Sequence, residues 1–111
     1  MKIAVIDIRD YRRAMIVTSL GENDINSVFS FAEISQEEFE NSGFDLALVH
    51  ENNREGNLIL NDLWVSNDVS IIFFSGGNSE AISRDGDLVF VSEEELFKRL
   101  PDLDYFLGFE L

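Results

Sequence analysis

The only histidine of the chain, His50, stands at the end of the apolar run FDLALVH (44–50), and Glu51 follows it directly. An apolar strand that stops at polar residues delivers their side chains to one edge of a sheet, where the ligands of α/β proteins bind. An imidazole beside a carboxylate can serve as a catalytic base, as a pH-sensitive regulatory group or as a hydrogen-bonded structural residue. Of these three roles we favour the structural one.

Two more polar residues end apolar runs in the same way. Asp7 closes KIAVID (2–7), and Ser75 follows VSIIFF (69–74). Because the carboxyl ends of parallel strands meet at one edge, we expect these side chains to share a pocket. Its expected members are Asp7, His50, Glu51 and Ser75. The set contains the residue types of a Ser/His/Asp triad, but Ser75 lacks the G-x-S-x-G nucleophile elbow, so we expect no catalytic residue and no enzyme.

The elements that position these residues alternate along the chain. Five apolar or alternating runs predict strands at 2–7, 25–31, 44–50, 69–74 and 87–91. Ser35 and Ser92 each precede a glutamate by three residues, which is the capping-box signature of a helix start. A further helix is expected from Asp10 to about Leu20, with Gly21 as its stop, and a weaker one at 57–67. This alternation predicts one α/β domain, residues 1–111, with a parallel sheet and helices on both faces.

The order of elements and the strand ends KIAVID, FDLALVH and SIIFFSGG resemble the receiver domain of two-component response regulators, over about residues 2 to 100. The resemblance implies a flavodoxin-like three-layer sandwich whose five-stranded parallel sheet has the order 2-1-3-4-5. The stretch GGNSEAISRDG (76–86) is too short for a full fourth helix. We therefore expect that helix to be short or missing.

The functional positions of that family are only partly present. Receivers bind magnesium with two acids after strand 1, accept a phosphoryl group on an aspartate ending strand 3, and use a hydroxyl after strand 4 and a lysine after strand 5. Asp7 and Ser75 match the first acid and the hydroxyl, whereas Ile8 replaces the second acid. His50 stands at the acceptor position, and Val91-Ser92-Glu93 occupies the corner of the lysine.

Without a second acid and a lysine, nothing balances the charge of an incoming phosphoryl group. The resemblance therefore indicates a degenerate pseudo-receiver without phosphotransfer, metal or cofactor. We expect it to act through binding another protein.

The net charge of −14 is unevenly distributed. Residues 1–20 carry +2, so the rest of the chain carries −16. Such a field repels nucleic acid and anionic membranes and favours a protein partner with a basic surface. Two alternatives stay open: a small acidic inhibitor that mimics nucleic acid, and, least favoured, an enzyme centred on His50. We expect Arg9, Arg12 and Arg13 to lie on a solvated face.

Cysteine is absent, no run approaches the roughly 20 apolar residues of a membrane span, and the start lacks a signal-peptide pattern. We therefore expect a cytoplasmic protein.

The C-terminal tail PDLDYFLGFEL (101–111) is rich in large apolar residues. So much apolar surface at one end must be covered. It either folds back over the gap left by the fourth helix or forms a homodimer or partner surface, and we favour the second use for at least part of it. The partner-binding candidates are Tyr105, Phe106, Leu107, Phe109 and Leu111.

Overall fold

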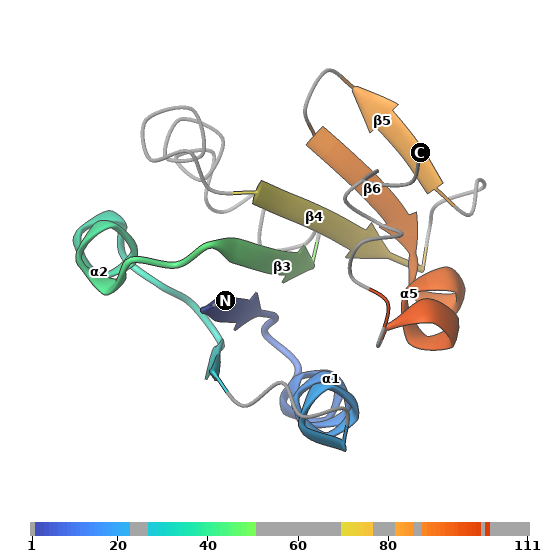
Figure 1. Cartoon of the computed structure of the whole chain (residues 1–111), viewed down its shortest axis with the longest axis horizontal. Coiled ribbons are helices and arrows are strands. Elements are labelled where there is room, and N and C mark those ends of the chain that lie inside the picture. Colours follow the sequence, from blue (N-terminus) through green and yellow to red (C-terminus); the bar gives the residue numbers. More distant parts are fainter. Residues whose placement is uncertain are drawn as a thin grey trace.

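The computed structural model describes residues 2–22, 27–50, 70–76, 82–85, 88–100 and 102. Within these ranges the chain forms six strands and three helices, arranged as an α/β structure (Figure 1). The strands are β1 (Ile3–Ile6), β2 (Val28–Phe31), β3 (Leu46–His50), β4 (Ser70–Ser75), β5 (Ile82–Asp85) and β6 (Leu88–Ser92). The helices are α1 (Asp10–Glu22), α2 (Gln36–Ser42) and α5 (Glu93–Arg99).

All six strands belong to one sheet with the order β2-β1-β3-β4-β6-β5. The first five strands in this order are mutually parallel, with registers such as Ile3↔Val28 and Ile3↔Leu46. The five predicted strands therefore have the expected order. The prediction of a purely parallel five-stranded sheet was wrong, because β5 adds an antiparallel sixth strand beside β6.

The additional strand lies in the segment where the fourth helix was expected to be short or missing. Ile82 pairs with Val91 and Asp85 with Leu88, so a helix across 76–86 is incompatible with the observed pairing. Only Gly86-Asp87 separates the two strands in the sequence. A connection of two residues can join antiparallel neighbours but not parallel ones, which explains the direction of β5.

Local signals determine the helix starts. The Ser35 hydroxyl accepts a hydrogen bond from the Glu38 N–H at 3.2 Å, and the Ser92 hydroxyl accepts one from the Glu95 N–H at 3.1 Å. Gly43 ends α2 with a φ of 68°, in the left-handed region that glycine adopts readily. Helix α1 continues through Gly21 to Glu22, two residues beyond the expected end at Leu20, so the prediction that Gly21 stops the helix was wrong. The predicted helix at 57–67 lies outside the described residues.

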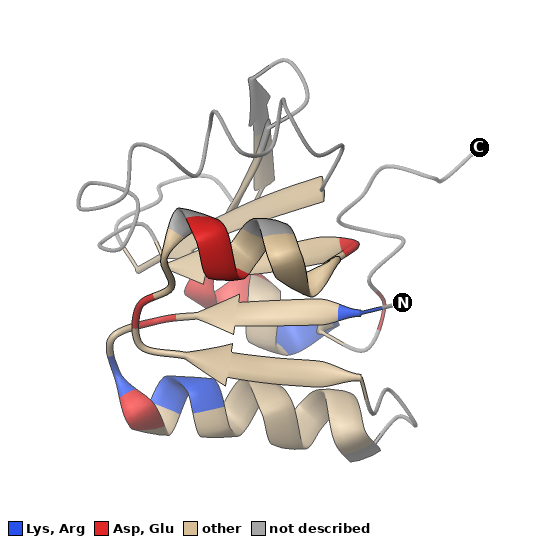
Figure 2. Cartoon of the chain, turned by 90° about the vertical axis from the view of Figure 1, so that its left-hand side faces the viewer, with Lys and Arg blue, Asp and Glu red and all other residues tan. Residues whose placement is uncertain are grey.

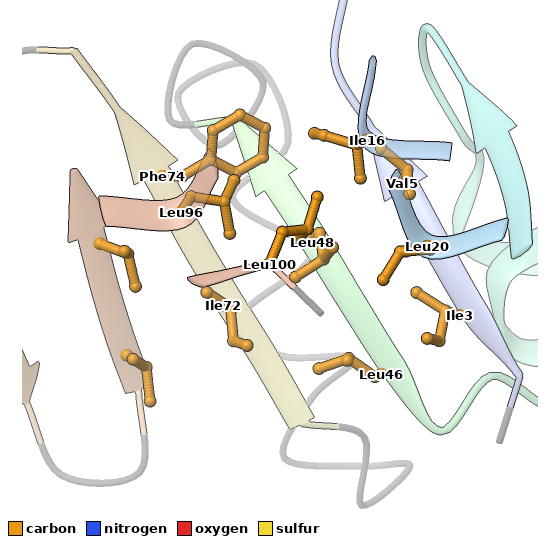
Figure 3. Close-up of a cluster of buried hydrophobic side chains, with 12 residues drawn as sticks. Ile3, Val5, Ile16, Leu20, Leu46, Leu48, Ile72, Phe74, Leu96 and Leu100 are labelled. Carbon is orange, nitrogen blue, oxygen red and sulfur yellow. The ribbon is translucent and has the colours of Figure 1, made fainter. Parts of the chain in front are cut away.

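Helices cover both faces of the sheet. Helices α1 and α5 lie on one face and α2 on the other (Figure 1). Figure 3 shows the cluster under α1 and α5, where Ile16, Leu20, Leu96 and Leu100 meet alternate residues of the strands. The cluster under α2 contains the intervening strand residues together with Phe39 and Phe44. Each buried strand thus contributes to two cores, which is why its sequence is apolar throughout.

None of the helices in the described ranges is both long and apolar enough to cross a membrane.

Candidate functional site

Asp7 and His50 lie at the carboxyl ends of neighbouring strands. Asp7 continues the alternation of Ile3 and Val5, and His50 continues that of Leu46 and Leu48, so both side chains lie on the face covered by α1 and α5. Asp7 is fully buried and His50 is 4% exposed. The His50 ring meets the Phe74 ring edge-on, with 5.1 Å between centroids. The predicted meeting of these two strand ends is therefore observed.

Arg12 forms a bidentate ion pair with Asp7. Its Nε lies 2.6 Å from Oδ2 and its Nη2 lies 2.9 Å from Oδ1 of the carboxylate. The backbone N–H of Arg9 also donates to Oδ1 at 2.9 Å. Arg12 reaches this position because it lies four residues before Ile16, on the side of α1 that faces the sheet. Both oxygens of the carboxylate thus have a donor within the protein.

The environment shifts the ionisation of both partners in a consistent direction. Burial raises the pKa of Asp7, but the hydrogen bonds from Arg12 and from the Arg9 backbone outweigh it, so this pKa lies below its ordinary value. The hydrogen bond to Asp7 raises the pKa of Arg12 above its ordinary value, against the opposing effect of burial. Asp7 is therefore held as a carboxylate and Arg12 as a cation.

Glu93, the first residue of α5, joins this pair to His50. Its Oε1 lies 3.2 Å from Arg12 Nη1 and 3.4 Å from His50 Nε2. This oxygen is buried, and neither nitrogen meets it with hydrogen-bond geometry, so the two contacts are ion pairs by distance alone. The His50 contact is charged only when the imidazole is protonated. We call Asp7, Arg12, His50 and Glu93 the charged quartet.

A glycine makes room for this arrangement. A Cβ atom added to Gly76, which follows β4, would lie 2.8 Å from Glu93 Oε2. That separation is shorter than a carbon and an oxygen can tolerate, so a larger residue would displace the carboxylate. The lack of a side chain at Gly76 leaves the space that the Glu93 carboxylate fills.

The charged quartet joins four elements, and both oxygens of its Asp7 carboxylate are occupied by donors of the protein. Arginine does not release its proton under physiological conditions, so the guanidinium is a fixed charge between two acids. A metal ion at Asp7 would have to displace a buried, doubly bonded guanidinium. Within the described ranges, no three His, Asp or Glu side chains are grouped as metal ligands. The geometry is that of an ion-pair network that links the ends of β1 and β3 to α1 and α5.

The structure brings together some of the predicted pocket residues and separates another. Asp7 and His50 share one face, whereas Ser75 continues the alternation of Ile71 and Phe73, which belong to the opposite core. Glu51 lies outside the described residues. The same holds for the tail residues Tyr105, Phe106, Leu107, Phe109 and Leu111.

Sequence reasoning missed two members of the quartet. Arg12 was expected on a solvated face but is 9% exposed, and Glu93 was placed at the corner of the receiver lysine without any role beyond the helix start. The signal for Arg12 was its helical spacing to Ile16 and Leu20. Glu93 carried no local signal, because its partners lie far away in the sequence.

Positive charge gathers at the start of α1. Figure 2 shows basic residues, which the sequence identifies as arginines, near the N-terminal end of this helix, while α2 carries acidic ones. Arg13 donates to the exposed carboxylate of Asp10, and Arg12 is used inside the quartet. Of the three arginines in this region, Arg9 is the exposed one. The cationic surface is thus smaller than the sequence alone indicates.

No protein-family model, curated protein or solved structure matches the chain.

Proposed function

We propose that the chain is a phosphorylation-independent pseudo-receiver with a flavodoxin-like fold, and that it works by binding another protein. One observation carries the proposal: Arg12 donates to both carboxylate oxygens of Asp7, at 2.6 and 2.9 Å. In the resembling family this carboxylate would help to hold magnesium. Here a covalently attached cation takes that role, so the site needs no exchangeable ion.

The other two members of the charged quartet, His50 and Glu93, support the same proposal. The family resemblance implies an acceptor carboxylate at the end of the third strand and a lysine facing it. In this chain His50 stands at the position of the acceptor carboxylate and Glu93 at the corner of the lysine, with 3.4 Å between His50 Nε2 and Glu93 Oε1. The acidic residue is thus on the side where receivers have their basic one. A histidine facing a carboxylate does not stabilise an incoming phosphoryl group in the way that an ammonium ion does. The charged quartet is better suited to holding elements together than to transferring phosphate.

The first experiment tests the loss of phosphotransfer. The full chain is incubated with magnesium and a small-molecule phosphodonor, and its intact mass is measured. We expect the mass to stay unchanged. A stable phosphate adduct on the wild-type chain contradicts the proposal, and repeating the reaction with Asp7→Asn then tells whether Asp7 was the acceptor.

The second experiment tests the binding function. The immobilised chain is used to capture proteins from an extract of its native host, with and without prior treatment with the phosphodonor. We expect the same partner in both cases, with retention that weakens as salt is added, because the chain carries −14 and the partner is expected to have a basic surface. Retention that appears only after phosphodonor treatment, or no retained protein, would contradict the proposal.

A further inference from the structure

Strand β2 forms one edge of the sheet and presents a row of backbone groups outward. The Ser27 and Phe31 carbonyls accept hydrogen bonds from the N–H groups of Ile3 and Asp7, at 2.9 and 3.1 Å. In a strand, alternate residues direct their N–H and C=O groups to the same side. The groups of Phe29 therefore face β1, and those of Val28 and Ser30 face away from the sheet. No described strand lies on that outer side.

This edge lacks the features that protect most sheet edges. Natural edge strands carry charged residues, proline or bulges that prevent pairing with another chain. Residues 27–32, SVFSFA, contain no charge and no proline, in a chain where charged residues make up 27%. Phe29 is 46% exposed. The opposite edge strand, β5, instead contains Arg84 and Asp85.

We infer that β2 pairs antiparallel with β2 of a second copy of this chain, about a two-fold axis at Phe29. The inference goes beyond the proposed function, whose partner is a different protein with a basic surface, and adds a contact between two copies of the chain. The two-fold axis places Val28 opposite Ser30 of the partner, so their outward N–H and C=O groups exchange two hydrogen bonds on each side. The sequence of this edge is thus complementary to itself.

The side chains at the axis fit the same arrangement. Phe29 would face Phe29 of the second copy as a non-hydrogen-bonded pair, the type in which side chains approach most closely. The Phe29 ring lies on the α2 side of the sheet. Its centroid is 6.0 Å from the centroid of the Phe44 ring and 5.1 Å from Lys2 Nζ. An aromatic pair at this position would cover the exposed part of both rings.

The uncharged edge limits the electrostatic repulsion between two copies of this acidic chain. Two chains of −14 repel each other wherever acidic surfaces meet. The uncharged run 27–32 allows a contact in which no carboxylate of β2 faces another. Because β2 has four residues, the paired area is well below the roughly 1,200 Å² of a stable interface, so we expect a weak and reversible dimer.

The experiment compares self-association of the full chain with that of edge variants. Sedimentation velocity over a wide range of concentrations should show the mean mass of the wild type rising towards that of a dimer. Ser30→Pro removes an outward N–H that β1 does not use, and Ser30→Lys places a charge on the edge. Both variants should keep the wild-type circular dichroism spectrum and stay monomeric. Ser83→Lys adds the same charge to the opposite edge and should associate like the wild type.

Amide hydrogen exchange locates the contact directly. Exchange at Val28 and Ser30 should slow as the concentration of the wild-type chain rises, while that at exposed residues of α1 should not. The inference is overturned if the wild type remains monomeric at the highest concentration, or if folded Ser30→Lys associates like the wild type. It is also overturned if truncation after Asp102 abolishes association. None of these outcomes bears on the phosphodonor test, so the two proposals can fail separately.

Discussion

Replacing Arg12 with methionine is expected to destabilise the fold by about 3–5 kcal/mol, the usual cost of removing one partner from a buried ion pair. Methionine keeps much of the apolar stem, so the main loss is the charged head group. Asp7 would keep only the 2.9 Å hydrogen bond from the Arg9 backbone, and Glu93 would lose its 3.2 Å contact with the guanidinium. The buried Asp7 and the half-buried Glu93 would then have lost the guanidinium that both of them contact.

Asp7→Asn is the matched comparison and should cost less, about 1–3 kcal/mol. In that variant Arg12 still has Glu93 as a counter-ion, and the oxygen of the introduced amide can still accept one hydrogen bond. Because the two residues are in direct contact, the double variant should lose less than the sum of the two single losses, by about 0.5–3 kcal/mol. The asymmetry between the single variants follows from the presence of Glu93.

Urea unfolding followed by circular dichroism measures these differences at neutral pH. The slope of free energy against urea must stay the same among the variants for the comparison to hold. A domain of this size is stabilised by about 5–15 kcal/mol, so Arg12→Met should remain measurable at low temperature. If Arg12→Met proves no less stable than Asp7→Asn, the guanidinium does not neutralise both acids and our reasoning about the quartet is wrong.

Four further predictions concern single features. Because the pKa of Asp7 is lowered in the folded state, the stabilisation by its carboxylate is complete above the ordinary carboxyl range and is lost as pH falls through the lowered value. The free energy of unfolding, measured by urea denaturation at a series of acidic pH values, should therefore fall less steeply with decreasing pH for Asp7→Asn than for the wild type. Ser92→Ala should cost about 0.5–2 kcal/mol and more than Ser35→Ala, because Ser92 also positions Glu93; equal thermal shifts would contradict this. Gly43→Ala should cost about 1–2 kcal/mol by urea unfolding, since alanine is strained at a φ of 68°, and an unchanged midpoint would argue against that backbone geometry. Phe106→Glu should weaken capture of the heterologous partner without changing the melting temperature; a lower melting temperature with capture intact would assign the tail to the core.

The parallel strands could be predicted from the sequence because burial on both faces requires consecutive apolar residues. The runs ending at Asp7 and His50 have this property, and their register brings the two residues to the same edge. The caps at Ser35 and Ser92 were equally predictable, because the hydrogen bond that defines a cap spans only three residues. In these cases the information is local.

Strand β5 and half of the charged quartet were not predictable in this way. The sequence ISRD contains a single large apolar residue, and it forms a strand because it returns beside β6. Arg12 and Glu93 are ordinary helix residues by local criteria. Arg12 is buried and Glu93 half-buried because α1 and α5 lie on the same face of the sheet, and a local pattern does not contain that information. Ser75 lies towards the other core because it continues the alternation of Ile71 and Phe73 along β4.

The ion pair between Arg12 and Glu93 connects two helices that are separated by most of the chain. Such a contact requires a large loop to close, and the cost of closing loops makes distant contacts slow to form. Because β6 leads directly into α5 and pairs with β4, we expect the contact between Glu93 and Arg12 to form late in folding. Its removal should therefore accelerate unfolding much more than it slows folding. The quartet would thus set how long the native state lasts and have little influence on how quickly it is reached.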